Sequence, residues 1–184
     1  MIDNYNDFKL FLDKKIKNLS EKPKLLLHTC CAPCSSYTIK FLKDYFDITI
    51  FYSNDNISPN DEYKNEDYQS AIKGEENLGE RSHRCYDCYK LRLEKTAQKA
   101  KKLGFDYFTT SLSISPYKVS KWINEIGFLL EDKYKISFLY SDFKKEEGYK
   151  ESIKLSKEYN LYRQDYCGCL YSKKERDEKK CQED

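Results

Sequence analysis

Residues 24–34 read Lys24-Leu25-Leu26-Leu27-His28-Thr29-Cys30-Cys31-Ala32-Pro33-Cys34. The run from Lys24 to His28 is short and apolar, which is typical of a buried strand. A loop follows from Thr29 to Pro33. Pro33 fits the first turn of a helix, where its missing N–H costs no hydrogen bond, and we expect that helix to continue to about Tyr45. A strand that leads directly into a helix is the beginning of an α/β unit.

The rest of the chain continues this alternation. Further strands are expected at Asp47–Tyr52, Asp106–Ser111 and Ile136–Tyr140. Helices are expected at Tyr5–Leu19, Cys85–Leu103 with Gly104 as C-cap, Tyr117–Tyr134 and Glu147–Tyr159. A turn at Ser53-Asn54-Asp55-Asn56 ends the second strand, and residues 60–72 show no clear pattern. The order predicts an α/β fold over residues 1–184: a single domain with a mainly parallel sheet flanked by helices in a Rossmann-like three-layer arrangement.

Composition limits the class of protein. The 184 residues suit one domain, and 35% charged with 39% apolar residues is typical of a folded, soluble chain. The net charge of +2 does not indicate a nucleic-acid-binding protein, although a local basic face can hide in a balanced total. Without an apolar run of membrane-spanning length or a signal-peptide pattern, we expect a cytoplasmic protein with no membrane partner. The charged tail 172–184 is expected to fray.

Seven of the eight cysteines fall into three close groups. The groups are Cys30-Cys31-x-x-Cys34, Cys85-x-x-Cys88 and Cys167-Gly168-Cys169. Because cytoplasmic thiols stay reduced, clustered cysteines there point to metal binding or redox chemistry rather than structural disulfides. The eighth, Cys181, lies in the charged tail and is interpreted as incidental.

The first group directly follows the first strand, and ligands of parallel sheets bind beyond the carboxyl ends of the strands. The N-terminus of the expected helix favours the thiolate form of Cys30 and Cys31. Adjacent side chains diverge, so the pair suits two irons of one cluster, or a cluster and a neighbouring metal, better than one zinc ion. Two small buried side chains are the plain alternative.

The other two groups differ in spacing. Cys85 and Cys88 lie three residues apart at a helix start, so both thiols share one face, a spacing found in metal and redox sites as well as in ordinary cores. A disulfide between Cys167 and Cys169 would close a small, strained ring, for which Gly168 supplies the backbone freedom. That pair would be redox-active, or it would provide two more metal ligands.

Other classes of site have little support. The chain has only two histidines, His28 and His83, which argues against a histidine-based triad or a histidine-rich zinc site. His28 is expected to be structural. The sequence contains no glycine-rich phosphate loop, so a nicotinamide or flavin cofactor is not indicated.

Five stretches together resemble the cobalamin-independent epoxyqueuosine reductases. They are Leu26–Cys34, Glu80–Leu93, Phe108–Leu112, Ser115–Lys118 with Ile123–Gly127, and Tyr162–Cys169. The stretches occur in the family's order and span nearly the whole chain from Lys24 to Ser172. Between Tyr63 and Gly74 the chain is shorter than the family pattern, so one element of the usual fold is expected to be missing or reduced.

The resemblance implies an oxidoreductase that reduces epoxyqueuosine to queuosine at the wobble position of tRNA and releases water. It further implies that Cys30, Cys31, Cys85 and Cys88 hold a [4Fe–4S] cluster. Cys167 and Cys169 would be the catalytic, redox-active pair. Cys34 matches a position close to the metal site and is a further candidate ligand, with an additional iron as a candidate cofactor. The partners would be tRNA carrying epoxyqueuosine in the anticodon and an unidentified electron donor.

Proton transfer and RNA recognition have candidates of their own. Asp165, Tyr166 or another tyrosine near the site are the candidate proton donors. Tyr52, Tyr117 and Trp122 are candidates for stacking on unpaired anticodon bases.

Two rival functions are open from the residues alone. One is a structural-zinc protein that binds RNA, because four thiolates suffice for a tetrahedral zinc site. The other is a thiol–disulfide oxidoreductase with Cys85 and Cys88 as its active pair, which would leave the remaining two cysteine groups unexplained.

Overall fold

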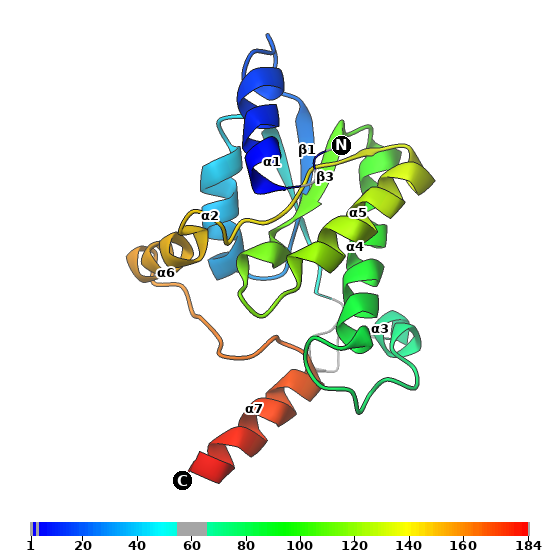
Figure 1. The fold of residues 1–184 in the computed structure, drawn as a ribbon, viewed down its shortest axis with the longest axis vertical. Coiled ribbons are helices and arrows are strands. Elements are labelled where there is room, and N and C mark those ends of the chain that lie inside the picture. The colour runs from blue at the N-terminus through cyan, green and yellow to red at the C-terminus, as the bar shows by residue number, and fades with distance from the viewer. Residues whose placement is uncertain (1, 3, 55–65, 184) are drawn as a thin grey trace.

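Four parallel strands form the centre of the molecule (Figure 1). The computed structural model describes residues 2, 4–54 and 66–183. The strands are β1 (Lys24–Thr29), β2 (Asp47–Tyr52), β3 (Tyr107–Thr110) and β4 (Ser137–Phe138), in the spatial order β2-β1-β3-β4. The expected single α/β domain with a parallel sheet is confirmed. Because the strand order reverses at β1, the fold has a switch point between β1 and β3, where such sheets bind ligands.

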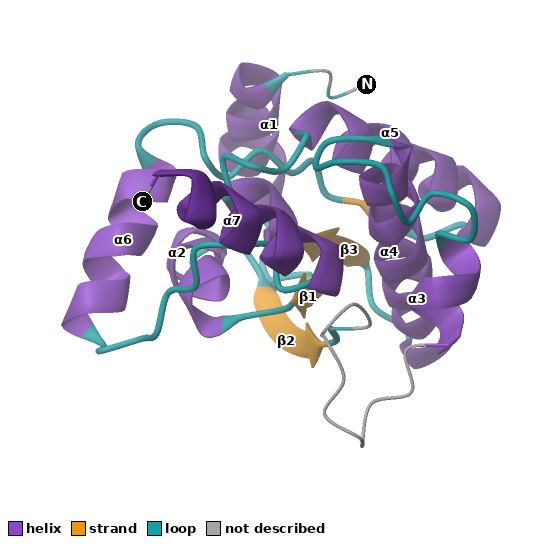
Figure 2. Ribbon diagram, turned by 90° about the horizontal axis from the view of Figure 1, so that it is seen from below, coloured by secondary structure: helices purple, strands orange, loops and turns teal. Residues whose placement is uncertain are grey.

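Helices cover both faces of the sheet. On one face α4 (His83–Leu103) and α5 (Ser120–Tyr134) enclose a core with Leu26. On the other, α1 (Tyr5–Phe11), the π-helical turn η1 (Leu12–Ile16) and α2 (Ala32–Leu42) enclose a core with Leu25. Leu25 and Leu26 serve opposite cores because successive strand residues point to opposite faces. Figure 2 shows this arrangement, with β1, β2 and β3 between α2 on one side and α4 with α5 on the other.

Further helices lie around this body. α3 (Glu66–Ala71) packs against α4, and α6 (Gly148–Glu158) packs against α2. α7 (Leu170–Glu183) extends from the lower end of the molecule in Figure 1. Among the described residues, no helix combines the length and the apolar character that a membrane crossing requires.

Most boundaries follow the local chemistry of the sequence. Gly104 ends α4 at φ +72°, a left-handed conformation that glycine adopts without strain, as expected for a C-cap. α5 begins at Ser120 rather than Tyr117, because Ser115–Lys118 form a turn in which the Lys118 N–H donates to the Ser115 carbonyl at 3.2 Å. β4 keeps only two of the five expected residues.

The remaining differences concern the ambiguous segment and the tail. Residues 66–71 of the unassigned stretch form α3, whereas residues 55–65 lie outside the described residues and include Asp55, Asn56 and the start of the shortened segment. The charged tail forms helix α7, which sequence patterning did not indicate. Whether that helix frays stays a prediction.

Candidate functional site

A cavity of about 420 Å³ opens beyond the carboxyl ends of β1, β2 and β3. Four segments from distant parts of the chain line it. They include Cys30, Cys31 and Cys34 after β1; Tyr52 and Asn54 at the end of β2; Ser115, Tyr117 and Lys118 before α5; and Tyr162, Arg163, Gln164, Tyr166 and Cys167 before α7. The position is the one expected for a ligand site in a parallel sheet.

A much smaller pocket lies beside this cavity and contains the remaining grouped cysteines. Its lining includes Cys85 and Cys88 from α4 together with Cys167 and Cys169. Cys167 and Lys118 line both spaces, so they mark the point where the two meet. The fold therefore gathers all three cysteine groups around one place.

Hydrogen bonds to the backbone fix the first cysteine group. Cys31 is the N-cap of α2, and its carbonyl accepts from the N–H of Ser35 at 3.2 Å. The Cys30 carbonyl accepts from Asn54 Nδ2 at 3.1 Å, and Asn54 Oδ1 in turn accepts from Arg92 at 2.9 Å. The β1–α2 loop is thus tied to the end of β2 and to α4.

The expected thiolate character of Cys30 and Cys31 is wrong. A hydrogen bond to Cys31, together with burial, raises the pKa of Cys30 well above its ordinary value. The hydrogen bond from Cys30 lowers the pKa of Cys31, but the one to Cys34 and burial raise it, to about 11. Desolvation and thiol neighbours outweigh the helix N-terminus here.

Cys85 lies in the first turn of α4, where its N–H donates to the Ser82 carbonyl at 3.0 Å, and Cys88 lies in the second turn. Cys88 packs with Tyr68 and Cys169 in a small buried cluster. Burial raises the pKa of both thiols. Their place at the start of a regular helix agrees with the shared face that their spacing predicts.

The third group lies on an irregular segment just before α7. Gly168 has φ +79°, the left-handed region that its lack of a side chain permits. The Cys167 N–H donates to Ser172 Oγ at 2.9 Å, the Ser172 N–H contacts Cys169 Sγ at 3.3 Å, and Ser172 Oγ donates to Glu80 at 2.5 Å. Both cysteines are free thiols.

The pKa values of the two thiols in this pair move in opposite directions. The Cys169 thiol donates to the Cys167 sulfur, and with the ammonium of Lys118, which also contacts that sulfur, it holds the pKa of Cys167 well below its ordinary value. Donating that hydrogen bond, together with burial, raises the pKa of Cys169. The guanidinium of Arg84 lies 3.9 Å from Cys169 Sγ and is bound to Glu175 at 2.9 Å.

The spacing of the sulfurs bears on which metal they fit. Four cysteines around one zinc ion, each about 2.3 Å from it, place their sulfurs roughly 3.8 Å apart. Among the described residues, the group of three potential ligand atoms within 4.8 Å of one another is Glu75, His83 and Asp87, and no three cysteines meet that limit. The described cysteines therefore do not form the compact set of sulfurs that a single zinc ion would bind.

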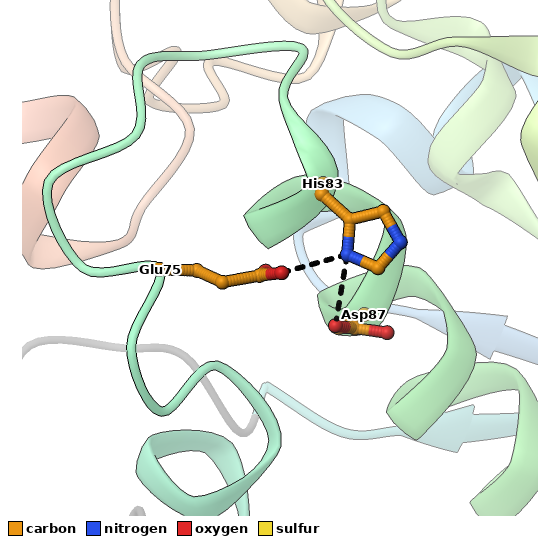
Figure 3. A group of neighbouring side chains, drawn as sticks. All are labelled: Glu75, His83 and Asp87. Atoms are coloured by element: carbon orange, nitrogen blue, oxygen red, sulfur yellow. Dashed lines mark hydrogen bonds and ion pairs between the residues drawn. The ribbon is translucent and has the colours of Figure 1, made fainter.

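Figure 3 shows the Glu75, His83 and Asp87 group, which lies where the loop after α3 meets the start of α4. His83 Nδ1 lies 2.7 Å from Glu75 and 3.3 Å from Asp87, and the hydrogen bond to Glu75 raises the pKa of this exposed histidine. The sequence analysis did not identify this group. The four-residue spacing of His83 and Asp87 on a helix was its only signal.

Other predicted residues have plainer surroundings. His28 is buried, with its ring nitrogens at 2.9 Å from Thr110 Oγ1 and 3.1 Å from the Ser53 carbonyl, so its expected structural role is confirmed. Asp165 is a poor proton donor, because hydrogen bonding to Lys180 and the neighbouring Arg176 lower its pKa. Cys181 is exposed on α7.

The aromatic residues predicted to stack on bases lie in two different places. Tyr52 and Tyr117 are exposed and line the cavity, whereas Trp122 packs against Tyr86 and the α4–α5 core. Tyr162, which the sequence analysis did not single out, is 81% exposed on the cavity rim.

Comparison with known proteins gives one consistent result. The profile of the family described as "Epoxyqueuosine reductase QueH" matches residues 25–69 and 60–175. The curated "Epoxyqueuosine reductase QueH" of Streptococcus pyogenes serotype M1 is 38% identical over 200 aligned positions, covering 93% of this chain and 78% of the relative. Those of Staphylococcus aureus (strain Mu50) and Thermotoga maritima are 35% and 36% identical, covering 94% and 84% of this chain and 88% and 93% of the relatives.

The alignment with the streptococcal relative is longer than the 184 residues of this chain. The relative therefore carries residues that have no counterpart here. That these missing residues fall between Tyr63 and Gly74 stays a prediction.

Proposed function

Because the chain belongs to the epoxyqueuosine reductase QueH family, a family of oxidoreductases, we propose that it reduces epoxyqueuosine to queuosine at the wobble position of tRNA. The observation that carries the proposal is the convergence of three cysteine groups on one cavity at the carboxyl edge of the sheet. Removing the epoxide oxygen as water, with a carbon–carbon double bond left behind, consumes two electrons and two protons. A site rich in thiols is suited to supply them.

Four of the cysteines would hold the cofactor. We assign Cys30, Cys31, Cys85 and Cys88 to a [4Fe–4S] cluster, with Cys34 as a candidate ligand of an additional iron. Support comes from their placement around one point, the burial of Cys88 with the partial burial of the other three, and a spread wider than one zinc ion needs. Such a cluster, when bound, supplies electrons one at a time. Because these thiols have raised pKa values, loading the cluster must release protons.

Cys167 and Cys169 would be the redox-active pair. They are free thiols that share a hydrogen bond across one glycine, and Cys167 lines the substrate cavity. Oxidation of such a pair to a disulfide provides two electrons in one step. An electron donor that remains to be identified would restore the dithiol.

The cavity has features suited to a base in an anticodon loop. Its volume of about 420 Å³ is within the range of pockets that hold small ligands. The exposed rings of Tyr52, Tyr117 and Tyr162 lie on its lining, where they can stack on unpaired bases. A tRNA substrate would place the reaction in the cytoplasm.

The first test is the metal content of protein purified without oxygen. We expect about four irons and four sulfides per chain, with visible absorption that bleaches on reduction. The iron-loaded protein should then convert epoxyqueuosine-tRNA to queuosine-tRNA, followed by mass spectrometry of the nucleosides. The matched control is Cys181→Ser, which removes an exposed cysteine far from the groups and should change neither result.

Two outcomes would count against the proposal in different ways. Stoichiometric zinc without uptake of iron would overturn the cluster and favour the zinc-protein alternative. Iron-loaded protein that leaves epoxyqueuosine-tRNA unchanged under several reductants would overturn the function itself.

A further inference from the structure

The two thiols of the Cys167–Cys169 pair face different surroundings. Cys167 lines the open cavity, whereas Cys169 does not and is only 6% exposed. Cys169 instead lines only the small pocket of about 10 Å³ beside Cys88, with the Ser172 N–H at 3.3 Å from its sulfur. Cys167 is therefore the thiol of the pair that a substrate in the cavity would meet first.

The two thiols also differ in their contact with Lys118. Its ammonium contacts the Cys167 sulfur and lies 5.6 Å from the centre of the Tyr89 ring. Burial alone would lower the pKa of Lys118, but the neighbouring Cys167 more than offsets this and holds it well above the ordinary value. The pair thus behaves as an ammonium beside a thiolate.

The backbone around Lys118 holds this side chain in place. The Lys118 carbonyl accepts from Lys144 Nζ at 3.1 Å, and its N–H donates to Ser115 within the turn before α5. The neighbouring Pro116 carbonyl accepts from Arg81 at 3.0 Å. This turn lies between β3 and α5, next to the switch point of the sheet. The positions of β3 and α5 therefore fix where the Lys118 ammonium lies.

We propose that Cys167 is the thiol that meets the substrate, that Cys169 is its resolving partner, and that Lys118 is the residue that keeps Cys167 reactive and protonates the departing oxygen. The proposal rests on the proposed function for the identity of the substrate. The order of the two thiols and the role of Lys118 come from the contacts described above.

The proton count supports a donor besides the two cysteines. A thiolate at Cys167 and a thiol at Cys169 that join in a disulfide release two electrons and one proton. Attack of the Cys167 thiolate on one epoxide carbon forms a C–S bond and breaks a C–O bond, and the released oxygen is protonated to a hydroxyl. Attack of Cys169 on the Cys167 sulfur then forms the S–S bond while the C–S and C–OH bonds break, which leaves the alkene and, with the Cys169 proton, water. In total the epoxide takes up two electrons and two protons. The missing proton comes from the Lys118 ammonium on the cavity wall, which regains it from solvent, and a dithiol reductant returns two electrons and the Cys169 proton to the disulfide.

The test is the rate at which iodoacetamide labels each cysteine of the full-length, iron-loaded protein between pH 6 and 9, read by tandem mass spectrometry. We expect Cys167 to be labelled before Cys169 in the wild-type chain. Lys118→Met should slow labelling of Cys167 at pH 7 by about tenfold or more and move its pH midpoint upward, since the thiolate loses its counter-charge. Lys118→Arg should keep much of the wild-type rate.

Cys181 is the internal control, because its labelling should be equal in every variant. Labelling of Cys169 first would overturn the assignment even if no variant folds, and an unchanged Cys167 rate in a folded Lys118→Met protein would overturn the role of Lys118. Turnover of epoxyqueuosine-tRNA is measured on the same samples. Correct labelling order without turnover would contradict the proposed function alone, whereas turnover with the wrong order would contradict only this inference.

Discussion

The cysteines assigned to the cluster and the cysteines assigned to the redox pair are held in different ways. Cys30 follows the end of β1, Cys31 is the N-cap of α2, and Cys85 and Cys88 lie in the first two turns of α4, so regular elements fix all four. Cys167 and Cys169 lie on an irregular segment that side chains of Ser172 and Glu80 hold in place. A cofactor needs fixed ligands, whereas a bond that forms and breaks in each cycle needs a segment able to adjust.

We call the four cysteines held by β1, α2 and α4 the rigid side of the site. The largest expected effect comes from removing one of these ligands. Cys85→Ser should lose most of the iron and sulfide and at least about 100-fold of the turnover, because losing a ligand costs more than losing an outer-sphere partner. Metal analysis and the epoxyqueuosine-tRNA assay measure both effects. Retention of a full complement of iron would show that Cys85 is not a ligand. The distinction between cluster cysteines and redox cysteines would then not hold.

The double variant Cys167→Ser/Cys169→Ser separates the two regions. It should keep iron and sulfide at the wild-type level and lose multiple turnover, because only the redox pair is missing. Metal content and turnover are compared with Cys181→Ser, which changes one exposed cysteine on α7, the helix that follows the pair. Full multiple turnover in the double variant would show that the dithiol has no part in the reaction.

Sequence patterning predicted the rigid side well. The apolar run of β1, the proline in the first turn of α2 and the C-cap of α4 are local signals, and the elements that hold Cys30, Cys31, Cys85 and Cys88 follow from them. The same elements set the parallel sheet and the edge at which the cavity opens.

The surroundings of Cys167 and Cys169 could not be derived in that way. Nothing in the sequence shows that Lys118, a single lysine in a turn, would be buried against Cys167, because burial depends on segments nearly fifty residues apart. The thiolate expected at Cys31 failed for the same reason: the helix terminus is local, whereas desolvation comes from the whole fold. The helix formed by the charged tail also has no local apolar signal.

A smaller effect is expected at the mouth of the cavity. Tyr162→Ala should raise the KM for epoxyqueuosine-tRNA about tenfold and leave iron content unchanged, since stacking on a base contributes about 1–3 kcal/mol. Tyr159→Ala is the matched control, because Tyr159 is also exposed but does not line the cavity. Equal kinetics for the two variants would remove Tyr162 from the RNA-binding surface.

A smaller effect on turnover is expected from a change in the backbone between Cys167 and Cys169. Gly168→Ala should lower turnover about fivefold or more at unchanged iron content, because the left-handed conformation costs an alanine about 1–2 kcal/mol. Gly104→Ala meets the same conformational cost at the end of α4, far from the pair, and should lower the thermal midpoint instead of turnover. If Gly168→Ala kept wild-type turnover, adjustment of this segment would not contribute to the cycle.

The smallest effect concerns the loop that leads into the rigid side. Since pairing with Glu75 and Asp87 raises the pKa of His83 in the folded protein, its stabilisation is complete below the unfolded pKa of about 6.5 and is lost as pH rises through the folded value. His83→Gln should therefore lower the urea midpoint slightly at pH 6 and leave it unchanged at pH 9, with iron content equal at both. The same loss at both pH values would mean that the histidine stabilises this loop by packing on Tyr86 rather than by its charge.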